Sequence, residues 1–324
     1  MGLIIDGFSH FMPKSFAEEL YKAHPTDELQ ELASFEYFGH VEDRVRILDK
    51  HQIDKQILTI ARPSIWLDLP KEIVPDMTRL ANDTLAEAAA LFPDRFIPVG
   101  SLPVPSEEFM PEFDRCMEDL GMAGIQVFAN VDGKNLDEPE FRAFFKKANE
   151  SDTTVWLHPQ LRKEWSTEYV LDKIFGWVFD TSMAMARLVF SGIMEECPNL
   201  KIITHHMGAM VPHFSERIKG FHDAGIFPRA NFAPLSKDPL EYFKRFYADT
   251  VLNGSVHGFE CGYKFFGPDQ IIFATDYPFG PEKGEAWMEG ALHQVREVSL
   301  PQAEKDEILG GNLMGLIEKR GGKG

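Results

Sequence analysis

Four apolar, β-branched segments of this chain each end in a histidine or an aspartate. They are residues 3–10 (LIIDGFSH), 153–158 (TTVWLH), 200–206 (LKIITHH) and 271–276 (IIFATD). Apolar runs of this kind are typical of buried parallel strands. In barrels of parallel strands, the carboxyl ends of the strands carry the chemistry. The pattern therefore predicts one active site built from segments that are far apart in the sequence.

Strand-like and helix-like segments alternate along the whole chain. Strands are predicted at 3–8, 55–61, 95–101, 123–128, 153–158, 200–205, 245–249 and 270–275. The main helices are predicted at 76–92, 107–120, 141–150, 169–196, 211–221, 256–266 and 285–298. This alternation predicts a parallel α/β sheet. At 324 residues, we expect a single (β/α)8 TIM barrel domain over residues 1–324.

Residues 12–40 do not fit the minimal alternation. They are polar but include Phe35, Tyr37 and Phe38. A long loop after the first strand of a barrel lies on the catalytic face, where such loops shape the pocket. We therefore expect this insert to contribute to substrate selection.

Composition excludes several classes of partner. The formal net charge of −18 disfavours binding to nucleic acid or to an anionic membrane. No apolar run approaches the roughly 20 residues of a membrane span. The three cysteines follow no metal-binding or disulfide spacing, which favours free thiols in a reducing, cytoplasmic compartment. No glycine-rich phosphate-binding pattern occurs, so a nucleotide cofactor is not expected.

Neutral imidazoles and a carboxylate are typical ligands of zinc and other first-row divalent ions. Several ordered motifs also resemble the amidohydrolase superfamily, and within it the aminocarboxymuconate-semialdehyde decarboxylase group. These motifs are IDGFSHFMP at 5–13, PDRF at 93–96, HP at 158–159, PNLKI at 198–202 with HMG at 206–208, FYADT at 246–250 and TDYPF at 275–279. The resemblance extends over essentially the whole chain.

The resemblance implies a site with one divalent metal ion, with zinc expected and manganese as the alternative. His10, His158 and Asp276 match the metal ligands of the group. His206 matches the sixth-strand histidine of the group, which implies a catalytic role for it together with Asp276.

Three arginines are candidates for binding a substrate carboxylate. Arg217 matches an arginine that reaches into a neighbouring subunit, which implies a homodimer. Arg44 falls near a second such arginine, although Arg46 aligns as readily. Arg62 follows the second strand on the catalytic side and could hold a carboxylate through two hydrogen bonds.

The chain departs from the group at Phe8, where a histidine or glutamate is usual. Phenylalanine offers no lone pair, so three protein ligands would remain, with an expected loss of metal affinity of about 10–100-fold. Asp6 is expected to lie too deep to replace the missing ligand. Strand alternation from His206 predicts that His205 points toward the helices, and Asp249 is expected to support a histidine.

The sequence leaves three functions open. The first is a metal-dependent, cofactor-independent decarboxylase acting on a small aromatic or unsaturated carboxylic acid. The second uses the same ligands to hydrolyse a lactone, an amide or a carbon–carbon bond. The third is a degenerate barrel that binds a small acid without turnover, and only Phe8 supports it.

Overall fold

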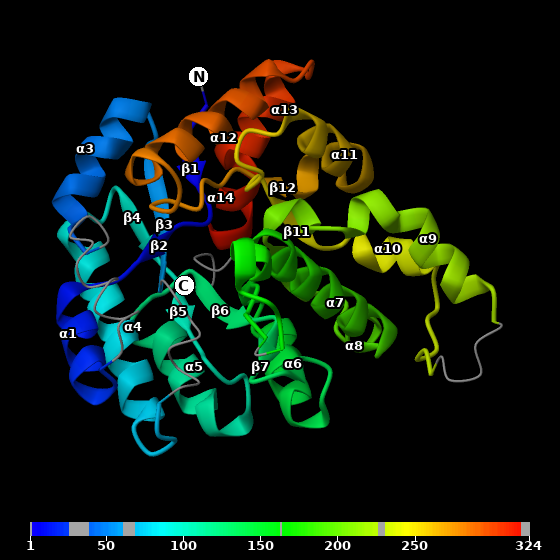
Figure 1. Ribbon diagram of the computed structural model, residues 1–324, viewed down its shortest axis with the longest axis horizontal. Coiled ribbons are helices and arrows are strands. Elements are labelled where there is room, and N and C mark those ends of the chain that lie inside the picture. The colour runs from blue at the N-terminus through cyan, green and yellow to red at the C-terminus, as the bar shows by residue number, and fades with distance from the viewer. Residues whose placement is uncertain (1, 26–38, 61–68, 163, 226–230, 319–324) are drawn as a thin grey trace.

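The computed structural model describes residues 2–25, 39–60, 69–162, 164–225 and 231–318. The protein has an α/β architecture in which short parallel strands lie at the centre and helices surround them (Figure 1). All neighbouring pairs in the two central sheets are parallel. The α/β class and the parallel sheet predicted from the sequence are therefore confirmed.

The parallel strands are divided between two sheets. In the first, β3 (Lys55–Ile60) pairs with β1 (Ile5–Asp6), β2 (His10–Phe11) and β4 (Phe96–Pro98). The hydrogen-bonding order of the second is β12 (Ile271–Ile272), β11 (Tyr247–Asp249), β10 (Lys201–Thr204), β9 (Thr154–His158), β6 (Gly124–Phe128) and β5 (Gly100–Ser101). Every predicted strand segment contains at least one of these strands.

Most predicted helices are present. They are α4 (Val74–Leu91), α5 (Met110–Glu118), α6 (Arg142–Glu150), α7 (Trp177–Phe190), α9 (Val211–Asp223), α11 (Val256–Phe266) and α12 (Glu285–Glu297). The continuous helix predicted over 169–196 is wrong. Gly192 adopts a φ of +83°, which separates α7 from the short α8 (Ile193–Glu196). A left-handed residue cannot continue a right-handed helix.

Other elements lie outside the predicted alternation. Helix α1 (Lys14–Ala23) lies within the expected 12–40 insert, of which residues 26–38 are outside the described part. Helix α3 (Val41–His51) follows it. The helices α10 (Pro239–Phe243), α13 (Gln302–Asp306) and α14 (Asn312–Ile317) are further additions. An antiparallel hairpin joins β7 (Asn130–Val131) to β8 (Lys134–Asn135).

A distinct hydrophobic cluster fills the space between the strands. It contains Ile5, Phe8, Trp156 and Ile203, and Leu313 of α14 packs into it. Side chains of alternate residues along each strand enter this cluster, so the next inward position at a strand end is His158 after Trp156 and His205 after Ile203. The packing thereby fixes which histidines face the interior.

Among the described residues, no helix combines the length and the apolar character needed to span a bilayer.

Candidate metal centre

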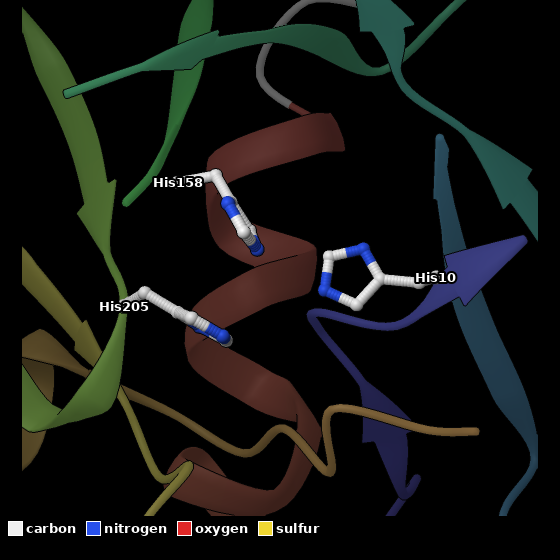
Figure 2. Close-up of side chains that lie close together, drawn as sticks. All are labelled: His10, His158 and His205. Atoms are coloured by element: carbon white, nitrogen blue, oxygen red, sulfur yellow. The ribbon is translucent and has the colours of Figure 1, made fainter. Parts of the chain in front are cut away.

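Three buried histidines from different strand ends point toward one another (Figure 2). His10 lies on β2, His158 ends β9, and His205 directly follows β10. Their ring centroids are 4.9 Å apart for His10 and His158, 5.2 Å for His158 and His205, and 6.2 Å for His10 and His205. One potential ligand atom from each lies within 4.8 Å of the other two. This spacing is compatible with a shared cation.

Each of these rings is fixed through Nδ1 by a protein oxygen. Nδ1 of His10 lies 3.0 Å from the hydroxyl of Thr59, and Nδ1 of His158 lies 2.6 Å from the carbonyl oxygen of Pro159. Nδ1 of His205 contacts a carboxylate oxygen of the fully buried Asp249. Metal-binding histidines in proteins are commonly oriented in this way, with the other ring nitrogen left for the metal.

The carboxylate of Asp276 lies next to the three histidines. Its Oδ1 lies 3.0 Å from Nε2 of His10 and 3.4 Å from Nε2 of His205. The contact with His10 lacks hydrogen-bond geometry, so the buried Nε2 of His10 has no hydrogen-bond partner. An unsatisfied buried nitrogen beside a carboxylate fits an arrangement in which both atoms face a common cation. The residues present therefore fit a divalent metal ion.

The charges of these groups are strongly coupled. Burial opposes the ionised form of Asp276, but His10 and His205 more than offset it and lower the pKa of its carboxyl. Burial likewise lowers the pKa of His205, but Asp249 and Asp276 outweigh it and raise that pKa to about 10. Burial, His10 and His205 together lower the pKa of His158, which keeps this imidazole neutral. The cluster thus combines an anionic oxygen and a neutral imidazole with a protonated His205, whose Nε2 proton a bound cation would displace.

His206 lies beside the cluster, in a left-handed backbone conformation with a φ of +57°. Its ring centroid is 4.1 Å from that of His205. It forms a second group of possible ligands with His205 and Asp276. Its Nδ1 is buried and has no hydrogen-bond partner. Burial, followed by His205, lowers the pKa of His206 well below its usual range, so the ring is neutral.

The prediction for His205 is wrong, because its side chain faces the cluster and not the helices. The hydroxyl of Thr204 donates to the sulfur of Met185 on α7, so Thr204 is the residue that faces outward. His205, one residue later, must then face inward. His206 lies beyond the end of the strand, where alternation no longer determines side-chain direction. It reaches the site through its left-handed backbone.

A buried polar network fixes Thr275, the residue before Asp276. Asp6 accepts hydrogen bonds from the backbone N–H and hydroxyl of Thr275, at 3.0 and 2.5 Å, and from Gln56 at 2.7 Å. Burial raises the pKa of Asp6 to about 6, although these hydrogen bonds oppose the shift. Because both of its oxygens already have partners in this network, Asp6 does not substitute for the ligand missing at Phe8.

Arg44 belongs to this network. It donates to Gln56 at 2.8 Å and to the carbonyl oxygen of His10, and its guanidinium lies over the ring of Tyr277. Burial lowers its pKa to about 10, and the group stays cationic at neutral pH. In this arrangement the guanidinium binds protein groups, and binding of a substrate carboxylate by Arg44 stays a prediction. Arg46 is exposed and pairs with Asp43.

Of the other two predicted arginines, the structure describes only Arg217, which lies outside the cluster. Arg217 lies on α9 in a surface groove of about 380 Å³ between α7 and α9, with its guanidinium over the ring of Phe221. Arg62 lies outside the described residues. Phe8 is fully buried, and its ring centroid is 4.4 Å from that of His205.

The sequence is similar to one protein family and to several decarboxylases. The sequence model of the amidohydrolase family matches residues 61–312. A 2-amino-3-carboxymuconate-6-semialdehyde decarboxylase from Dictyostelium discoideum is 28% identical over 277 residues, which cover 85% of this chain and 75% of that protein. A gamma-resorcylate decarboxylase from Rhizobium sp. is 29% identical over 250 residues, covering 73% of this chain and 76% of the relative.

Solved structures show the same fold. A 5-carboxyvanillate decarboxylase from Sphingomonas paucimobilis superposes with a TM-score of 0.85 at 21% identity, covering 98% of this chain and 99% of the other. A dihydroxybenzoic acid decarboxylase from Polaromonas sp. was solved with bound manganese and the inhibitor 2-nitroresorcinol. It superposes with a TM-score of 0.81 at 26% identity, covering 98% of this chain and 97% of the other. The predicted resemblance to the aminocarboxymuconate-semialdehyde decarboxylase group is confirmed.

Proposed function

Because the chain belongs to the amidohydrolase family, we propose that its histidine and aspartate cluster is the centre of a metal-dependent carboxy-lyase. The substrate would be a small aromatic or unsaturated carboxylic acid, and no organic cofactor is required. The four similar proteins described above are decarboxylases by name, and three of them are named for aromatic acids. The observation that carries the proposal is the convergence of His10, His158 and His205, each anchored through Nδ1, with the carboxylate of Asp276 3.0 Å from His10.

We assign metal binding to His10, His158 and Asp276. A divalent ion held there would supply Lewis acidity and a template for the substrate carboxylate and a neighbouring oxygen. Manganese in the Polaromonas relative supports a divalent ion without deciding which ion this chain binds, and zinc stays our preference because imidazole and carboxylate ligands suit it.

Decarboxylation breaks the bond between the carboxylate carbon and the carbon that carries it. Carbon dioxide leaves, and the electron pair that remains must be captured by a proton. We assign this proton transfer to His206, whose buried Nδ1 has no hydrogen-bond partner and is free to carry it. For this, the neutral ring first takes up a proton from solvent; Asp276, ionised and adjacent, would stabilise the resulting imidazolium until it passes that proton to the carbon.

The decisive experiment incubates the purified protein, supplied with zinc or manganese, with hydroxybenzoates and muconates. Release of carbon dioxide and incorporation of one solvent-derived hydrogen at the vacated carbon are expected. Incorporation of solvent oxygen would instead identify a hydrolase. Tight binding without any product would identify a barrel that only binds acids.

We also infer that the two sheets close into one (β/α)8 barrel, with the 12–40 insert on its catalytic face. Backbone hydrogen bonds from Gly7 to Phe273, from Asp276 to Phe8 and from His10 to Tyr277 support this closure, because they join the first strands to the end of β12. Among the cysteines, Cys116 and Cys197 are buried free thiols, which supports a cytoplasmic location.

We further propose a homodimer that forms through α7 and α9. The groove between these helices has exposed apolar side chains, including Phe179, Met183 and Phe214, which are 47%, 38% and 37% exposed. An apolar face of this kind is typical of a protein interface. Arg217 lies within it, and so would be placed to reach a neighbouring subunit.

A further inference from the structure

Phe8 and His205 occupy neighbouring positions in the metal centre. Their ring centroids are 4.4 Å apart, whereas Phe8 is 5.6 Å from His10 and 5.8 Å from His158. Phe8 is fully buried and contributes only packing. A hydrophobic ring therefore stands in the cluster where a fourth ligand could be, and the imidazole closest to it is that of His205.

His205 has the features of a ligand and not of a packing residue. It is 1% exposed, and its Nδ1 is held by the carboxylate of Asp249, which directs Nε2 to within 3.4 Å of Asp276 Oδ1. The carboxylate of Asp249 also receives backbone N–H groups from Met207 and Val251, so it is itself fixed. Carboxylate-supported histidines are a common device for orienting and strengthening a metal ligand.

We propose that His205, supported by Asp249, replaces the metal ligand that Phe8 cannot provide. The metal centre then consists of His10, His158, His205 and Asp276, which restores the number of protein ligands expected in the absence of this substitution. This inference rests on the proposed metal-dependent function. It differs from the site predicted from the sequence, in which only three protein ligands remained.

His205 is then a metal ligand and His206 is not, although the two residues are adjacent in the sequence. His205 faces the cluster through an anchored ring, whereas Nδ1 of His206 has no hydrogen-bond partner. Substitution of His205 should therefore remove metal, and substitution of His206 should not. His206→Ala is accordingly the matched control for His205→Ala.

The test measures metal affinity directly, without reference to turnover. Metal-free protein is titrated with Mn²⁺ while the EPR signal of the free ion is followed, and with Zn²⁺ against a chromophoric chelator. We expect His205→Ala to raise Kd by more than about 100-fold, and Asp249→Asn to raise it by about 10–100-fold, the usual effect of removing an outer partner. His206→Ala should change Kd by less than about threefold, because it removes no ligand under this proposal.

A rescue variant distinguishes loss of a ligand from loss of folding. Phe8→His places an imidazole next to position 205, so the double variant Phe8→His/His205→Ala should recover metal affinity to within about tenfold of the wild type if the two positions are equivalent. Circular dichroism of each metal-free variant checks that the fold is retained.

Two results overturn the inference. One is a folded His205→Ala protein that binds metal as tightly as the wild type. The other is a folded double variant that binds metal no better than His205→Ala. In both cases the wild type would still bind metal and release carbon dioxide, so the proposed function would stand. A wild-type protein that binds no divalent ion would instead remove the proposed function and this inference together.

Discussion

His206 separates proton transfer from metal binding at the scale of single residues. We expect His206→Ala to retain the metal while turnover falls by about 10²–10⁴-fold, the usual contribution of a positioned proton-transfer group. Metal content by elemental analysis and kcat under substrate saturation provide the measurement. Asp276→Ala should reduce both quantities, because Asp276 is assigned both roles. Loss of metal in His206→Ala would show that His206 is a ligand.

Asp6 is a second residue whose substitution gives a specific expectation. All of its observed partners are donors, from Thr275, Gln56 and the backbone of Phe8. In Asp6→Asn the amide group would oppose two of these donors. We expect the free energy of unfolding, measured with urea, to fall by about 1–3 kcal/mol, the cost of leaving buried polar groups unsatisfied. The exposed Asp94→Asn variant should change stability by less than about 0.5 kcal/mol.

Individual residues also show where the sequence stops being informative. The apolar runs visible in the sequence place His158 at the end of β9, His10 at the start of β2 and Asp276 shortly after β12. Alternation counted from His206 gives the wrong direction for His205, because His206 lies beyond the strand. Alternation counted from Ile203, a residue inside β10, places His205 correctly.

At the scale of elements, helices α4 and α5 are joined by a buried polar cluster around Glu112. Glu112 on α5 accepts hydrogen bonds from Asn82 of α4 at 2.7 Å and from Arg115 at 2.8 Å. Burial raises the pKa of Glu112, but these partners outweigh it and hold the pKa below its ordinary value of 4.5. A carboxyl with a depressed pKa contributes stability above its unfolded pKa, and this contribution is lost as the pH falls through the folded value.

We therefore expect Glu112→Gln to be less stable than the wild type at pH 7, by about 1–3 kcal/mol. Below about pH 4.5, the wild type should lose stability more steeply than the variant, so that the two curves approach each other. Urea unfolding at pH 7 and at successively lower pH gives both curves, with the exposed Glu108→Gln as a control. Parallel curves would contradict a depressed pKa for Glu112.

The elements differ in how well the sequence predicts them, for local reasons. The prediction for helix α11 matches its observed range, because apolar spacing continues to Phe266 and Gly267 follows it. The region 169–196 reads as one helix, since its composition is largely apolar, but Gly192 takes a left-handed conformation that composition does not reveal. The β7–β8 hairpin consists of two-residue strands, which are too short to produce a periodic signal.

At the scale of the whole molecule, a net charge of −18 should oppose association, yet α7 and α9 expose a largely apolar groove. The net charge and the apolar groove are compatible if a second copy of the chain covers the groove. Arg217, which lines the groove, places a positive charge at this face of an otherwise acidic protein. The exposed apolar side chains would then be buried in the assembly, as is usual at homodimer interfaces. The dimer proposal thus predicts association that depends on this groove.

Met183 provides the test, because it lines the groove and is 38% exposed. In Met183→Asp, dimerisation would bury an unpaired carboxylate, which costs several kcal/mol. We expect the dimer dissociation constant from sedimentation equilibrium to rise by at least about tenfold, equivalent to about 1.4 kcal/mol or more. Leu91→Asp should leave the dimer dissociation constant unchanged, because Leu91 is 63% exposed at the end of α4, outside the groove.

A wild-type monomer with full activity would rule out both the dimer and the role of Arg217 in a neighbouring subunit. Dissociation by Leu91→Asp but not by Met183→Asp would place the interface on a different face of the molecule.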